Sequence, residues 1–127
     1  MREKKKIKSK NSHIGIHIVA DFWGGKIIKS SHELKILLAN AARRGNNTPL
    51  KFALHKFSPQ GITGVVLLAE SHISFHAWPE FAYTSIDIFT CGKNSKPEEV
   101  LKFFQKELLP KTMRVKRVKR GERDSIQ

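Results

Sequence analysis

The chain has 127 residues, the length of a single domain, and its 39% hydrophobic and 28% charged residues are typical of soluble globular proteins. No apolar run approaches the ~20 residues that a membrane-spanning helix needs, and no segment has the features of an export signal. A single cysteine excludes an intrachain disulfide, so we expect a cytoplasmic protein without a membrane anchor.

The formal net charge of +13 is concentrated at the two ends of the chain. Residues 1–10 carry six Lys or Arg against one acid, and residues 111–127 carry seven against two. Because the centre is not basic, we expect no specific nucleic-acid partner. The predicted organisation is a basic tail over residues 1–12, one domain over 13–121 and a short tail over 122–127.

Hydrophobic periodicity and turn residues divide the chain into eight elements. Ser30 and Ser31 are N-cap residues for a helix that Gly45 ends, and Pro97 suits the first position of a second helix. In chain order, the predictions are a strand over 13–22, a helix between Ser30 and Gly45, strands over 50–57, 62–70, 72–78 and 83–91, a helix over 98–109 and a strand over 113–120.

The middle strands are separated only by short turns, which join antiparallel neighbours. The order β-α-β-β-β-β-α-β therefore predicts an α+β two-layer sandwich, with a mostly antiparallel sheet and both helices on one face. The strand over 62–70 is predicted to be mostly buried.

The segment LLAESHISFHAWPE, residues 67–80, places unusual chemistry on a strand. His72 and His76 would share one face but lie ~13 Å apart at ~3.3 Å per residue, too far for one zinc ion. Cys91 or Glu80 could add a ligand, but we favour a site without metal. Taken singly, these residues have ordinary structural explanations, since a free cysteine on a strand is usually a small buried hydrophobe.

The combination of motifs points elsewhere. HKFSPQGITGVVLLAESHISFHAWPE (55–80), followed by FTCG (89–92), resembles the prokaryotic S-adenosylmethionine decarboxylase family. The resemblance runs from about Gly15 to residue 121 and leaves the lysine-rich residues 1–12 outside. It implies a pyruvoyl-dependent enzyme that decarboxylates S-adenosylmethionine to the aminopropyl donor for spermidine and other polyamines.

The resemblance also implies that the protein is made as a proenzyme that cleaves itself between Glu70 and Ser71. The Ser71 hydroxyl would attack the Glu70 carbonyl, and elimination followed by hydrolysis would leave a pyruvoyl group on residue 71. This group would bind the substrate amine as a Schiff base. The products would be a β chain of residues 1–70 and an α chain of residues 71–127.

Further roles carry over to matching positions. The resemblance implies His76 as the proton acceptor in processing and Cys91 as the proton donor in catalysis. Thr63 stands where the family usually has serine, which keeps the hydroxyl but predicts slower processing. The implied substrate-binding residues are Phe57 as a platform for adenine, Ile73 and His76 beside the base, and Glu80 on the ribose hydroxyls. Trp78 is interpreted as a core residue or a pocket wall, with the core favoured.

Ser71 and His76 present a geometric difficulty, because on a straight strand they lie ~16 Å apart, beyond proton-transfer distance. Either the chain bends or two protomers share a site. Since the resemblance implies dimers with sites at the interface, we expect a homodimer of αβ protomers, possibly within a higher oligomer, whose pockets draw residues from both subunits.

Two other functions stay open on the sequence. Some archaeal relatives in this fold decarboxylate arginine instead, although Phe57 and Glu80 favour a nucleoside substrate. A small basic RNA-binding module would explain the net charge, but the chain has no recognisable nucleic-acid-binding motif.

Overall fold

The computed structural model of the protein describes residues 13–123, so the predicted tail over 1–12 and residues 124–127 of the predicted tail over 122–127 lie outside the described residues. The elements follow the predicted order. They are β1 (Gly15–Trp23), α2 (Ser31–Arg44), β2 (Pro49–Lys56), β3 (Ile62–Leu68), β4 (Ser71–Trp78), a short 3₁₀ helix η1 (Pro79–Phe81), β5 (Tyr83–Cys91), α3 (Pro97–Leu108) and β6 (Thr112–Arg120).

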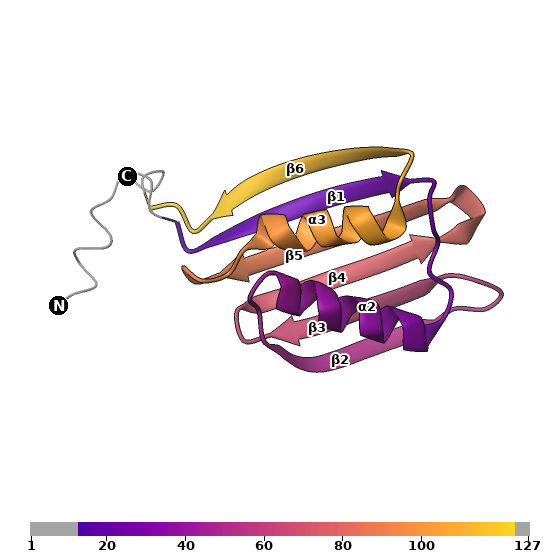
Figure 1. Cartoon of the computed structure of the whole chain (residues 1–127), viewed down its shortest axis with the longest axis horizontal. Helices are drawn as coiled ribbons and strands as arrows, with labels where there is room; N and C mark the ends of the chain where they lie inside the picture. Colours follow the sequence, from indigo (N-terminus) through magenta and orange to yellow (C-terminus); the bar gives the residue numbers. More distant parts are fainter. Residues whose placement is uncertain (1–12, 124–127) are drawn as a thin grey trace.

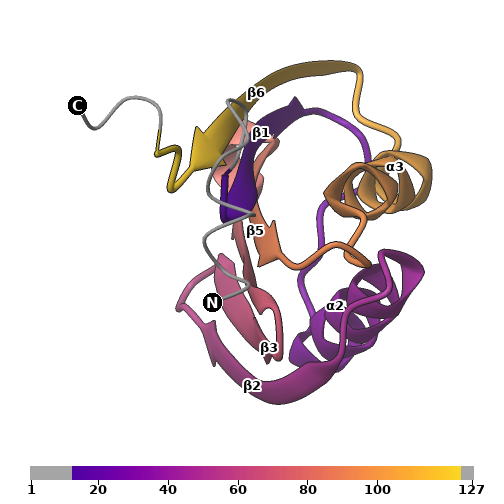
Figure 2. The same ribbon diagram turned by 90° about the vertical axis from the view of Figure 1, so that its left-hand side faces the viewer.

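The strands form one antiparallel sheet in the order β2-β3-β4-β5-β1-β6. The strands β2 to β5 follow one another as a meander, whereas β1 is inserted between β5 and β6 (Figure 1). Both helices lie on the same side of the sheet (Figure 2). The predicted α+β sandwich with helices on one face is therefore confirmed.

The helix ends agree with the local signals in the sequence. Ser30 is the N-cap of α2, and its side chain accepts a hydrogen bond from the backbone N–H of Glu33 at 3.2 Å. Gly45 ends the helix, and its N–H bonds back to the last turn. Pro97 opens α3, where its missing N–H is not needed.

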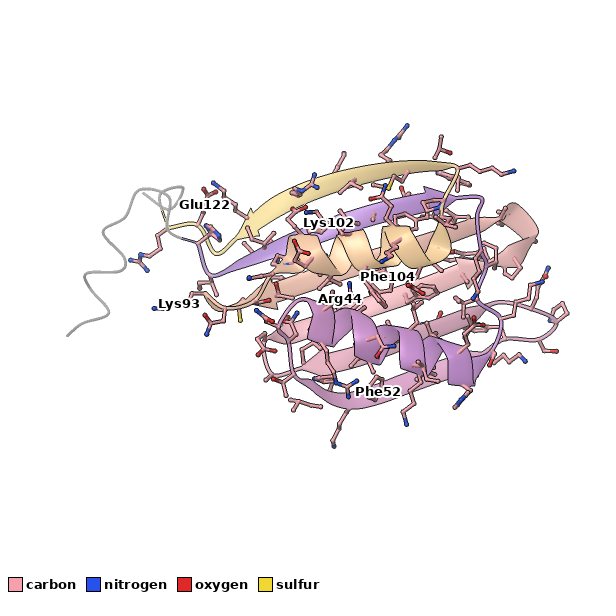
Figure 3. The ribbon with its side chains drawn as sticks, in the orientation of Figure 1. Arg44, Phe52, Lys93, Lys102, Phe104 and Glu122 are labelled. Atoms are coloured by element: carbon pink, nitrogen blue, oxygen red, sulfur yellow. The ribbon has the colours of Figure 1, made fainter. Side chains whose placement is uncertain are left out.

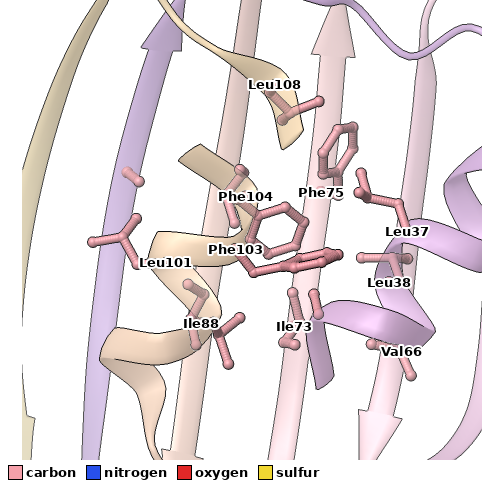
Figure 4. Packing of buried hydrophobic residues seen from close by; sticks show 14 of the residues in the cluster. Leu37, Leu38, Val66, Ile73, Phe75, Ile88, Leu101, Phe103, Phe104 and Leu108 are labelled. Atoms are coloured by element: carbon pink, nitrogen blue, oxygen red, sulfur yellow. The ribbon is translucent and has the colours of Figure 1, made fainter. Parts of the chain in front are cut away.

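The core fills the space between the sheet and the two helices. Alternate residues of β4 point into it, with Ile73 and Phe75 at 0% exposure. The ring of Phe104 from α3 packs against Phe75 with centroids 6.0 Å apart (Figure 4). Burying a side chain of this size contributes about 1.5–3 kcal/mol, so the period-two pattern of the strands decides which face meets the helices.

The face of the sheet opposite the helices is covered by no element among residues 13–123, and we call it the open face. Strand β3 is mostly buried, as predicted, since four of its seven residues are buried and only Leu67, on the open face, is exposed, at 49%. The placement corrects the interpretation of Trp78 as a core residue, because this side chain lies on the open face and is 37% exposed. Trp78 instead lines a pocket, which was the other interpretation. Within the described part of the chain, no helix is long and apolar enough to cross a bilayer.

Candidate active site

The predicted cleavage point lies at the turn between β3 and β4. Ser71, the first residue of β4, has a φ of 141°, a conformation that is strained for a residue with a side chain. Glu70 is anchored by its side chain, whose Oε1 accepts a hydrogen bond from the Thr48 backbone N–H at 3.0 Å. The Glu70–Ser71 peptide is therefore held in place and next to a strained residue.

Cys91 contacts the carbonyl oxygen of Glu70 twice. Its backbone N–H donates to this oxygen at 3.0 Å, and its Sγ donates at 3.1 Å. Two donors on one carbonyl have the arrangement of an oxyanion hole, which stabilises the negative charge that develops when a nucleophile attacks. The motif resemblance implied only a later role for Cys91, as the proton donor in catalysis, and this contact was not predicted.

At the other end of β4, Thr63 and His76 face each other across the β3–β4 pair. The Thr63 Oγ1 lies 3.0 Å from His76 Nδ1, so the hydroxyl fixes one edge of the imidazole ring. Thr63 and His76, for which the motif resemblance implies roles as processing support and as proton acceptor, are thus in direct contact.

A row of stacked rings holds the other side of the imidazole. The ring of His76 lies 5.7 Å from that of Trp78, Trp78 lies 5.2 Å from Tyr83, and Tyr83 lies 4.4 Å from Trp23, all centroid to centroid and nearly parallel. The Tyr83 hydroxyl donates to Asp21 Oδ1 at 2.5 Å. Desolvation, together with this bond, raises the pKa of Tyr83 to about 12. This row was not predicted from the sequence, because β5 and β1 contribute one ring each and only the pairing of the strands brings these rings together.

A pocket of about 210 Å³ opens beside His76. Three of the predicted substrate-binding residues line it, Phe57, His76 and Glu80, together with Thr63. The ring of Phe57 contacts that of His55 in a T-shaped arrangement with centroids 4.5 Å apart, and the residue is still 49% exposed, so ring surface is available to a planar ligand. The structure does not bring Ile73 to this pocket, because its side chain points to the helices and is fully buried.

His72 and His76 lie on the same face of β4 but have different partners. The Nδ1 of His72 is 3.3 Å from Ser71 Oγ, whereas His76 bonds to Thr63. Within residues 13–123, no group of three or more His, Cys, Asp or Glu side chains is placed to hold a metal ion.

Two clusters therefore stand at opposite ends of β4: the cleavage cluster, Glu70, Ser71 and Cys91, and the histidine cluster, Thr63 and His76. The pairing of β4 with β3 and β5 runs without a register shift over the whole strand, so the chain does not bend between them. Five residues of extended strand separate Ser71 from His76 by ~16 Å. Of the two solutions that the sequence left open, a bend within the chain is excluded.

Comparison with known proteins gives consistent results. A family model described as S-adenosylmethionine decarboxylase matches residues 16–121. An S-adenosylmethionine decarboxylase proenzyme from Methanococcus maripaludis is 41% identical over 110 residues, covering 85% of this chain and 90% of the relative. One from Sulfurihydrogenibium sp. is 42% identical over 110 residues, covering 85% and 83%.

A solved structure agrees with the sequence matches. The crystal structure of the adenosylmethionine decarboxylase from Aquifex aeolicus superposes with a TM-score of 0.80 at 37% identity, covering 87% of this chain and 92% of that one. The resemblance drawn from the motifs and the prediction of an enzyme are thereby confirmed. The chain belongs to the S-adenosylmethionine decarboxylase family.

Proposed function

We propose that this chain is a proenzyme that cleaves itself between Glu70 and Ser71 and then decarboxylates S-adenosylmethionine in the cytoplasm to give the aminopropyl donor for polyamine synthesis. The observation that carries the proposal is the Glu70 carbonyl, held by two donors from Cys91 beside a strained Ser71. The names of the relatives support the substrate and the proenzyme state.

Self-cleavage would begin when the Ser71 hydroxyl attacks the Glu70 carbonyl carbon. The new C–O bond replaces the C–N bond, and the hydroxyl proton moves to the released nitrogen. Strain at Ser71, worth on the order of 1–3 kcal/mol, and the Cys91 donors both favour this step, which is unfavourable for a relaxed amide. The ester would then be the only link between the two parts of the chain.

Elimination requires a base for the Cα proton of residue 71. His76 is the candidate, since its ring is fixed by Thr63 and histidine is the side chain that most often serves as a general base. Loss of the proton breaks the Cβ–O bond and frees the Glu70 carboxylate. Hydrolysis of the remaining enamine takes up water, releases ammonia and leaves the pyruvoyl group.

The residues around position 71 fit a pyruvoyl group, because the Cys91 thiol already reaches the neighbouring carbonyl at 3.1 Å. When present, this group supplies an electron sink for decarboxylation. Cys91 would afterwards deliver a proton to the substrate carbon. A reducing compartment keeps the thiol free for that task.

A homodimer would solve the separation of the two clusters. A two-fold axis through the middle of β4 would place the histidine cluster of one protomer over the cleavage cluster of its partner. The open face supports such an interface, because apolar side chains including Trp78 and Leu67 are exposed on it. Near the middle, Asp87 accepts hydrogen bonds from Ser74 at 3.1 Å and contacts His17 at 3.1 Å, so its carboxylate could be buried without losing its partners.

The pocket beside His76 fits the nucleoside part of the substrate. The exposed ring of Phe57 offers a face for adenine, and the Glu80 carboxylate suits the two hydroxyls of a ribose. Ile73 takes no part through its side chain, since it lies in the core. Arginine has neither an aromatic base nor a diol, so these residues favour S-adenosylmethionine over arginine.

Denaturing mass spectrometry of the purified protein tests the cleavage. We expect two chains that part at residues 70 and 71, with the second blocked by a pyruvoyl group, whereas the Ser71→Ala variant stays intact. A natural chain that remains whole after long incubation would refute the proposal. Release of labelled carbon dioxide from carboxyl-labelled S-adenosylmethionine then tests the substrate, and release from arginine alone would contradict it.

A further inference from the structure

Thr90 carries a buried hydroxyl group without a partner. The residue is 2% exposed, and within residues 13–123 only two buried side-chain nitrogen or oxygen atoms lack a hydrogen bond, Thr90 Oγ1 and Asn47 Nδ2. Asn47 is still bound through Oδ1, which accepts from Ser95 at 2.7 Å. The Thr90 side chain has no second polar atom that could be bonded instead. An isosteric valine would fill the same space without the cost of an unpaired hydroxyl.

The position of Thr90 explains why the hydroxyl would be useful. Thr90 on β5 is the register partner of Ser71 on β4. Because the next pair along, Glu70 and Cys91, shares a hydrogen bond, Ser71 and Thr90 form a non-bonded pair, in which the Cα atoms approach to about 4.5 Å. The residue that cleavage transforms is thus the cross-strand neighbour of Thr90, the residue that carries the unpaired hydroxyl.

Thr90 also borders a second pocket, of about 300 Å³, at the end of the sheet. Cys91, Gly92 and Lys93 line this pocket together with Gly15, and Lys93 extends from this end of the sheet (Figure 3). The glycine is required for the close approach, since a Cβ at Gly15 would lie 2.8 Å from the Thr90 carbonyl oxygen. The strands therefore pack tightly around Thr90, yet its hydroxyl is left unbound.

Self-cleavage would change the hydrogen-bonding groups of residue 71. In the precursor, Ser71 has a hydroxyl that can donate, and its Oγ lies 3.3 Å from His72 Nδ1. After cleavage, residue 71 would carry a ketone, which has an acceptor oxygen and no donor. A hydroxyl that is unpaired before cleavage, on the residue that pairs with position 71, matches the requirement of this oxygen for a donor.

We propose that Thr90 is a further catalytic residue of this chain, whose hydroxyl donates a hydrogen bond to the ketone oxygen that self-cleavage creates at residue 71. The inference rests on the proposed self-cleavage. The bond would polarise the ketone and thereby make its carbon more electrophilic towards a substrate amine. Thr90 would act only after cleavage, so it is distinct from the groups that assist cleavage itself.

Three variants test this role. Thr90→Val removes the hydroxyl and keeps the shape, Thr90→Ser keeps the hydroxyl, and Thr84→Val is the matched control. Thr84 lies on the same strand and the same face, is 1% exposed, and pairs with Ala77 instead of residue 71. Each full-length protein is assayed for melting temperature, extent of cleavage by mass spectrometry, rate of oxime formation with hydroxylamine, and turnover of S-adenosylmethionine.

We expect Thr90→Val to melt at the natural temperature or above it and to cleave within about twofold of the natural rate. Its oxime formation and its turnover should both fall by about tenfold or more, since both depend on the polarised ketone. Thr90→Ser should restore both rates, and Thr84→Val should leave oxime formation unchanged.

Oxime formation and turnover within about twofold of the natural protein in Thr90→Val would overturn the inference. If Thr90→Val does not fold, Thr90→Ala provides a second protein without the hydroxyl. Folded variants that lack the hydroxyl and fail to cleave would also overturn it, because the hydroxyl would then serve cleavage. An uncleaved natural protein would remove the proposed function together with this inference, whereas a cleaved natural protein with an unaffected Thr90→Val removes the inference alone.

Discussion

At the scale of single residues, individual side chains and backbone groups contact the atoms that take part in the proposed cleavage. The backbone N–H of Cys91 and its thiol both contact the Glu70 carbonyl oxygen, and the Thr63 hydroxyl contacts one nitrogen of His76. A backbone donor survives any side-chain substitution, whereas a side-chain donor does not. The contributions of the two kinds of donor can therefore be separated by mutation.

Replacement of Cys91 by alanine should slow self-cleavage but not abolish it. The variant loses the thiol donor at 3.1 Å and keeps the N–H donor at 3.0 Å, so we expect a decrease on the order of 10- to 100-fold. A time course of cleavage after cell-free synthesis measures the rate. Cys91→Ser retains a donor and should cleave faster than Cys91→Ala. An alanine variant that cleaves at the natural rate would show that the thiol contact has no part in cleavage.

The Thr63 hydroxyl should be needed to orient His76, while its methyl group should not. Thr63→Ser keeps the contact to Nδ1 and is expected to cleave at least as fast as the natural protein. Thr63→Val has the same shape without the hydroxyl and should be about tenfold slower or worse, because a misaligned base transfers protons poorly. The same cleavage time course compares the two. Equal rates for serine and valine would mean that the ring of His76 is held by its stacking on Trp78 alone.

At the scale of elements, local signals predicted α2, α3 and each strand, and short turns predicted antiparallel neighbours among the middle strands, but the pairing of strands far apart in the sequence was not predicted. The cap at Ser30 and the proline at the start of α3 are local features, and the structure has both elements where these features predict them. The insertion of β1 between β5 and β6 depends on pairing over long sequence distances, which no turn residue encodes. The contact of Cys91 with Glu70 follows from the register of β4 against β5, whereas the short turn between these strands predicted only that they are antiparallel neighbours.

The prediction of the site residues on β4 did not take into account that successive side chains of a strand point to opposite faces of the sheet. The motif resemblance named Ile73 and His76 as neighbours of one ligand, yet residues three apart on a strand point to opposite faces. Their assignment followed the motif and not the alternation. The pocket at Phe57, His76 and Glu80 was predictable, because all three residues lie within one recognisable stretch of sequence.

An ion pair joins the edge strand β6 to α3, and its contribution to stability depends on pH. Arg117 donates to both carboxylate oxygens of Glu98, through Nε at 2.5 Å and Nη2 at 2.9 Å. These hydrogen bonds lower the pKa of Glu98 below its ordinary value of 4.5, so the ionised form is favoured in the folded protein. The stabilisation is therefore complete above about pH 4.5 and is lost as the pH falls through the lowered pKa of Glu98.

Removal of this ion pair should lower the melting temperature modestly at neutral pH and not at acid pH. We expect Arg117→Gln to melt a few degrees lower at pH 7 in low salt, since the pair is half exposed, and the deficit should shrink at lower pH as Glu98 takes up a proton. Lys119→Gln, on the same strand, is the control for loss of one positive charge. Calorimetry at both pH values measures the effect, and a deficit that is the same at pH 3 and pH 7 would contradict the ion pair as its cause.

At the scale of the whole molecule, the roles proposed for Ser71 and His76 favour a site shared by two protomers. The strand is paired on both sides throughout its length, which fixes the cleavage cluster and the histidine cluster at opposite ends. Bringing the clusters together within one protomer would break the hydrogen bonds that join β4 to its two neighbours, β3 and β5. The exposed apolar side chains of the open face supply a surface on which two copies could meet.

Two inactive variants should therefore restore each other. Neither Ser71→Ala, which lacks the nucleophile, nor His76→Ala, which lacks the base, is expected to cleave alone. When both are synthesised together, about half of the dimers are mixed and contain one site with Ser71 from one chain and His76 from its partner. Mass spectrometry should then find cleaved His76→Ala chains and intact Ser71→Ala chains. Co-synthesis of His76→Ala with a chain that carries both substitutions is the matched control and should give no cleavage. If the mixture of folded variants also stays intact, the site is complete within one protomer, and the shared dimer is wrong.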